Sequence, residues 1–95
     1  MNTNEQVVLI NGTFSDIEAK EILFNIIGTK IQFHSMKNFS AQERFGKDDA
    51  HSVKRIADLN HDFEKMKEII DQAKANNLNL NIHSTIHISF SEKQK

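Results

Sequence analysis

Apolar and polar residues alternate along the segment Leu78–Phe90, LNLNIHSTIHISF. Apolar side chains occupy positions 78, 80, 82, 86, 88 and 90, and only Ser84 interrupts this series. A period of two residues predicts a β-strand with one apolar face. The alternative is a hairpin that turns at Ser84-Thr85, but such a turn would place His83 opposite Ile86 and mix polar with apolar residues. The pattern therefore favours one extended strand.

A shorter apolar run near the amino terminus, Gln6–Ile10, predicts a second strand that ends at the turn signal Asn11-Gly12. Both faces of this run are apolar, which is typical of a strand covered on two sides. The strand over 78–90 would span about 43 Å at about 3.3 Å per residue. The first strand would pair with only about half of it.

Between these strands the apolar spacing becomes helical. Ser15 and Glu18 match a capping box, which predicts a helix beginning at Asp16. Apolar residues cover two sides of this helix: Ala19, Ile22, Leu23, Ile26 and Ile27 on one, and Ile17, Phe24 and Ile31 on the other. A helix that is apolar over so much of its circumference packs against more than one neighbour. The spacing predicts that it continues past Gly28 to about Met36.

The segment that follows is less regular. Ser40-Ala41-Gln42-Glu43 matches a second capping box and predicts a single helical turn ending at Gly46. Phe39 and Phe45 are expected to pack against the helices on either side.

A second long helix is predicted from Asp48 or Asp49 to Asn76-Asn77, because Asp is a good N-cap and Asn tolerates the left-handed conformation at a helix end. Its apolar residues alternate in steps of three and four and form one narrow seam: Ile56, Leu59, Phe63, Met66, Ile70 and Ala73. His61 lies opposite this seam and is expected to be exposed. His34 is expected to border the core.

The predicted fold is α+β, with the order β-α-α-β in a single domain over residues 1–95. A long antiparallel helical hairpin packs on an antiparallel sheet. Soluble proteins rarely leave a strand edge open, so the unpaired half of the last strand predicts that dimerisation completes the sheet. Two copies would pair about a twofold axis near Ser84.

The charges are nearly balanced: 12 basic and 13 acidic residues give a formal net charge of -1. This argues against nucleic-acid binding, which requires a basic patch. The basic residues of the middle segment are Lys37, Arg44, Lys47, Lys54 and Arg55, and acidic residues interrupt them. Cysteine is absent, and no signal peptide or membrane-length apolar run is recognisable. We therefore expect a cytoplasmic protein.

Candidate chemistry is sparse. His83 and His87 lie about 13 Å apart along a strand, too far to share a metal within one chain. No phosphate-binding loop, nucleophile elbow or HExxH motif is present. We expect no cofactor or metal. The candidate ligand or partner surfaces are the polar strand face and the segment 39–51, with the residues His83, Thr85, His87, Arg44, Lys47 and His51.

The run from Ile10 to Ile56 resembles small hypothetical proteins of Bacteroidetes-type bacteria that have no assigned function. Asn11-Gly12-Thr13-Phe14 and Phe39–His51 are its most distinctive parts. The resemblance implies a bacterial, cytoplasmic origin and assigns no catalytic residue.

The sequence therefore predicts a non-enzymatic homodimer that serves as an interaction or scaffold module, with an unidentified protein as a possible partner. The alternative is a small-ligand-binding or catalytic dimer that uses the polar strand face or the segment 39–51.

Overall fold

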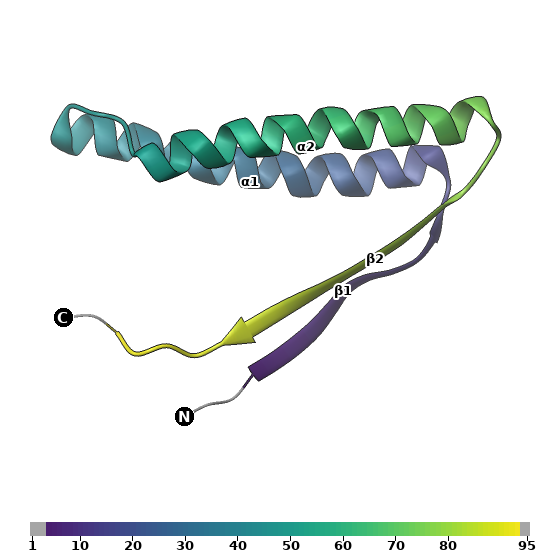
Figure 1. Ribbon diagram of the computed structural model, residues 1–95, viewed down its shortest axis with the longest axis horizontal. Helices are drawn as coiled ribbons and strands as arrows, with labels where there is room; N and C mark the ends of the chain where they lie inside the picture. Colours follow the sequence, from purple (N-terminus) through teal and green to yellow (C-terminus); the bar gives the residue numbers. More distant parts are fainter. Residues whose placement is uncertain (1–3, 94–95) are drawn as a thin grey trace.

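The computed structural model describes residues 4–93. The elements follow in the order β1 (Asn4–Phe14), α1 (Asp16–Phe45), α2 (Ala50–Ala75) and β2 (Leu80–Ser89). The predicted α+β class and β-α-α-β order are confirmed. The two long helices form a hairpin packed on a two-stranded antiparallel sheet (Figure 1).

The capping box at the start of α1 is present. Glu18 donates its backbone N–H to the Ser15 hydroxyl oxygen at 3.1 Å, and the Ser15 N–H donates to a Glu18 carboxylate oxygen at 2.9 Å. The box thus satisfies the backbone N–H groups of Ser15 and Glu18 locally, and the helix begins at Asp16, as predicted.

The carboxyl end of α1 differs from the prediction. The helix does not stop near Met36 but continues without a break to Phe45, so residues 40–46 do not form a separate turn. Gly46 ends the helix in the left-handed conformation, with a φ of 67°, and its N–H donates to the Gln42 carbonyl at 2.9 Å. The assignment of Gly46 as the terminating residue is confirmed.

The seam along α2 faces α1 as predicted. Leu59, Ile70 and Ala73 are buried, and the remaining seam residues are half-buried. The ring centres of Phe24 and Phe63 lie 4.5 Å apart between the two helices. Apolar contact along this seam holds the hairpin together.

The sheet consists of β1 and β2, and β2 is one continuous strand, as predicted. β1 is longer than the predicted run 6–10, because Asn11 and Gly12 do not form a turn but pair with His83 and Ile82. β1 pairs with β2 from Asn4↔Ser89 to Phe14↔Leu80. The expectation that half of β2 lacks a partner within the chain is therefore wrong.

A β-bulge lies in β1 between Val8 and Ile10, where the register shifts by one residue. Residues opposite each other in an antiparallel pair share a face, so the bulge moves Ile10 onto the face of the even-numbered β2 residues. The apolar sheet face thus defined contains Val7, Ile10, Phe14, Leu80, Ile82, Ile86 and Ile88. The polar sheet face, on the other side, contains Asn81, His83, Thr85 and His87.

The sheet and the helical hairpin meet at one end and then diverge. The strands leave the end of the hairpin where β1 enters α1 and α2 leads into β2, and their far ends lie away from the helices (Figure 1). The Cα atoms extend over 52 × 37 × 15 Å, with a radius of gyration of 17.1 Å. A compact domain of this length has a radius of gyration of about 12 Å. The protomer is therefore flat and open.

The buried apolar side chains among residues 4–93 are Ile10, Ala19, Ile27, Leu59, Ile70 and Ala73. Many large apolar side chains remain in water. Phe39 and Phe45 were expected to pack against the helices, but they are 58% and 69% exposed. Val7, Ile86 and Ile88 are also exposed, at the end of the sheet that lies farthest from the helices.

Candidate functional site

The six candidate residues occupy two separate places. His83, Thr85 and His87 lie on β2, whereas Arg44, Lys47 and His51 surround the turn between the helices. This turn lies at the opposite end of the helical hairpin from the end where the strands leave it (Figure 1). The structure does not bring the two groups together into one site.

The polar sheet face is an exposed surface. His83, Thr85 and His87 lie opposite Asn11, Val8 and Gln6, and all three are exposed. At the end of the face nearest the helices, the Thr13 hydroxyl donates to the Asn81 side-chain oxygen at 2.7 Å. This contact links the two strands and orients their polar groups.

Polar side chains close the turn between the helices. Asp48 accepts hydrogen bonds from the Gln42 side chain at 2.6 Å and from the Asn38 side chain at 3.4 Å. The Asn38 side-chain oxygen accepts the backbone N–H of Asp49 at 2.7 Å. Asn38 and Gln42 thus bind the turn from the last two turns of α1. These contacts give the segment a structural role.

Asp49, one of the two residues that the sequence offered as a cap, is the N-cap of α2. One of its carboxylate oxygens accepts both the backbone N–H of Ser52, at 3.2 Å, and the Ser52 hydroxyl. The hydroxyl of Ser52 is the principal cause that lowers the pKa of Asp49, because its hydrogen bond favours the charged carboxylate. The Ser52 side chain is fully buried by this contact.

Around the turn, one of the three candidates borders a small open hollow. Arg44 and Asp49 border a hollow of about 230 Å³ that also includes Lys37, Ser40, Ala41 and Phe45. Lys47 and His51 are exposed beside it and do not line it. The hollow is small, so it presents three charged groups, Lys37, Arg44 and Asp49, without enclosing a ligand.

His34, which the sequence placed at the edge of the core, lies between the helices. Its Nδ1 atom is enclosed and has no hydrogen-bond partner, and its ring centre lies 6.2 Å from that of His51. Removal of this ring from water lowers the pKa of His34, and the positive charge of Arg55 acts in the same direction. One pattern in the sequence indicates this position, because His34 follows Ile27 by seven residues on the face that packs on α2.

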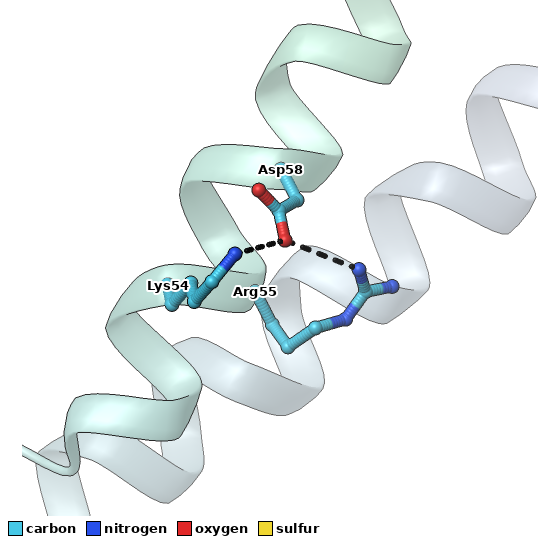
Figure 2. Close-up of polar contacts among 3 residues, drawn as sticks. All are labelled: Lys54, Arg55 and Asp58. Atoms are coloured by element: carbon cyan, nitrogen blue, oxygen red, sulfur yellow. Dashed lines mark hydrogen bonds and ion pairs between the residues drawn. The ribbon is translucent and has the colours of Figure 1, made fainter.

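The charged residues on α2 form the ion pairs that helical spacing predicts. Asp58 contacts the Lys54 ammonium at 3.3 Å and the Arg55 guanidinium at 3.6 Å (Figure 2). The three side chains are well exposed, so each pair stabilises the helix by about 0.5 kcal/mol or less. This cluster is part of the solvated surface of α2.

Within residues 4–93 no group of three or more His, Cys, Asp or Glu side chains is placed to hold a metal ion. None of the described helices is both long enough and apolar enough to cross a membrane. The chain matches no protein-family model, and no curated protein or solved structure is significantly similar to it.

Proposed function

We propose that this chain is a non-enzymatic homodimeric interaction or scaffold module of the bacterial cytoplasm. The observation that carries the proposal is the solvent-exposed surface of the protomer, 7989 Å². A compact monomer of the same mass, 10.9 kDa, exposes about 5,600 Å². The protomer therefore exposes about 2,400 Å² more than a self-contained domain would.

A second copy of the chain accounts for this excess. If the copy covers half of it, each protomer buries about 1,200 Å², and the interface totals about 2,400 Å². Permanent homodimers bury about 2,000–5,000 Å² in total. The excess surface is therefore large enough for a permanent homodimer.

Apolar side chains supply the surface that such an interface needs. Val7, Ile86 and Ile88 are exposed on the apolar sheet face. On α1, the positions of Ile22, Ile26, Thr29, Phe33 and Met36 alternate in steps of four and three, which places them along one side of the helix. Ile22 and Ile26 are half-buried, whereas Phe33 and Met36 are exposed. Burial of these residues against a second copy would stabilise the fold by about 25 cal/mol per Å².

The alternative, a small-ligand-binding or catalytic dimer, receives less support. Its candidate residues lie in two distant places, and those at the turn surround a network that has a structural role.

Sedimentation equilibrium at micromolar concentration tests the proposal. We expect a mass of twice the 10.9 kDa chain, and a midpoint of thermal unfolding that rises with protein concentration because association and folding are linked. A cooperatively folded species of 10.9 kDa, with an unfolding midpoint independent of concentration, would overturn the proposal.

A further inference from the structure

Each strand of the sheet has one edge without a partner among the described residues, and the two edges are not equivalent. β1 carries the bulge between Val8 and Ile10, which interrupts the regular row of backbone donors and acceptors along that strand. β2 carries no extra residue between Leu80 and Ser89. A regular edge is a template for another strand, whereas bulges protect an edge against such pairing.

We propose that the second copy pairs with this chain through the β2 edge, antiparallel, with Ser84 on the twofold axis. The result is a continuous four-stranded sheet with the order β1-β2-β2-β1. This inference rests on the proposed homodimer and specifies which edge forms it and in which register.

The alternation of side chains restricts the register. When two copies of one strand pair symmetrically, the residue numbers of any two opposite residues add up to the same sum. Opposite residues share a face of the sheet, and the apolar residues of β2 are even-numbered. The apolar faces of the two copies therefore coincide only if that sum is even. With Ser84 opposite itself, Ile82 lies opposite Ile86 of the second copy, and Leu80 lies opposite Ile88. Every large apolar side chain of β2 then faces another. A shift of the axis to Thr85 places Ser84 opposite Ile86, and Leu80 then lies opposite Phe90, which follows the end of β2. A shift to His83 places Ser84 opposite Ile82, and Ile88 then lies opposite Leu78, which precedes β2.

This register also covers the exposed end of the sheet. Leu80 and Ile82 are half-buried at the end of the sheet near the helices, where α1 contacts both strands, whereas Ile86 and Ile88 are exposed beyond it. The twofold axis places the exposed end of each β2 beside the half-buried end of the other. Ile86 and Ile88 of one copy therefore lie next to residues that α1 of the other copy covers.

Disulfide trapping tests the register, and the chain is suited to it because it contains no cysteine. Residues opposite each other in an antiparallel pair have Cα atoms about 4.5–5.5 Å apart, within the range that a disulfide spans. Ser84→Cys should therefore form a disulfide-linked dimer under mild oxidation. The linked fraction should exceed that of His87→Cys at least several-fold, because two copies of residue 87 would lie about 20 Å apart.

A pair of exposed positions on the polar sheet face tests the same register independently. Asn81 lies opposite His87 of the second copy, whereas the two copies of residue 81 would lie about 20 Å from each other. Neither Asn81→Cys nor His87→Cys alone should cross-link. A mixture of the two, unfolded and refolded together so that chains exchange, should give a linked heterodimer.

The outcomes separate this inference from the proposed function. Cross-linking of Ser84→Cys and of the mixed variants, in proteins with unchanged circular dichroism, supports β2 pairing. A mass of two chains without either cross-link overturns the β2 register and leaves the homodimer in place. A mass of one chain overturns both.

Discussion

Ile10 lies opposite Ser84 in the antiparallel pair, immediately after the bulge that shifts β1 by one residue. This shift turns Ile10 toward the apolar sheet face, where it is 9% exposed, while Val8 on the other face is 63% exposed. Ile10 is therefore the buried residue of β1, on the apolar sheet face.

Truncation of Ile10 is expected to destabilise the protein strongly. Ile10→Ala should lower the free energy of unfolding by about 2–5 kcal/mol, because it removes buried apolar contacts and leaves a cavity. The matched control is Val8→Ala, which should change the free energy of unfolding by about 0.5 kcal/mol or less because its side chain is exposed. Urea denaturation followed by circular dichroism measures both. Equal effects of the two changes would contradict the assigned faces.

The cap of α2 should make the protein sensitive to acid. The pKa of Asp49 is lowered in the folded state, so the ionised carboxylate contributes stability above the pKa of the unfolded chain. This contribution is lost as the pH falls below about 4 and through the folded-state pKa. Asp49→Asn keeps a good cap but cannot titrate, and its stability should therefore change less between pH 5 and pH 3.

Asp62→Asn, on the exposed surface of the same helix, is the control for this experiment. It should retain the acid dependence of the unmodified protein. Thermal unfolding midpoints at several pH values provide the measurement, and identical slopes for Asp49→Asn and Asp62→Asn would count against the role of the cap.

His34 should add a second pH dependence in a different range. Its pKa is lowered in the folded state by removal from water and by the charges of Arg55, His51, Lys37 and Lys30. The unfolded chain therefore binds the proton more tightly, so stability is full above about pH 6.5 and falls as the pH decreases below that value. His34→Gln should flatten the stability profile between pH 7 and pH 5.

The control for His34 is His61→Gln, since His61 is exposed on α2. That variant should keep the profile of the unmodified protein. A profile that flattens equally in both variants would show that histidine content, and not the position between the helices, determines the effect.

Ile86 tests the role of the apolar sheet face in association. It is 40% exposed in the protomer and lies opposite Val7. Ile86→Asp introduces a charge that the proposed interface would bury, so it should abolish dimerisation or folding. Val8→Asp, on the polar sheet face and on β1 rather than at the β2 edge, is the matched control and should leave the mass in solution unchanged. A dimer of normal stability formed by Ile86→Asp would exclude the apolar sheet face from the interface.

The parts of the fold that could be predicted from the sequence are those in which local signals and tertiary contacts agree. Ser15 and Glu18 cap α1 as their spacing indicates, and Asp49 caps α2. The seam of α2 from Ile56 to Ala73 predicted which face packs on α1. Strict alternation predicted β2 as a single strand.

The errors arose where a local signal was overridden. Ser40 and Glu43 match a capping box, but the helix continues through them because Asn38 and Gln42 bind the turn at Asp48 and Asp49. These contacts extend α1 to Phe45, and nothing in the local sequence reveals them.

In β1, too, contacts with a distant part of the chain override a local signal. Asn11-Gly12 is a strong turn signal, but pairing with His83 and Ile82 supplies the backbone hydrogen bonds of a strand instead. A pairing with residues so far away in the sequence cannot be recognised from the local pattern.

The six candidate site residues lie in two separate places for a related reason. Spacing along the chain did not reveal that the turn and the strands lie at opposite ends of the hairpin.

The pairing of the first strand with the last also determines the order of events during synthesis. The partner of Val7, Ile86, is added to the growing chain 79 residues after it. At about 5–20 residues per second this delay lasts about 4–16 s. Throughout that time the run Val7–Ile10 has no strand to pair with, so the nascent chain presents a segment that chaperones can bind until β2 has been synthesised.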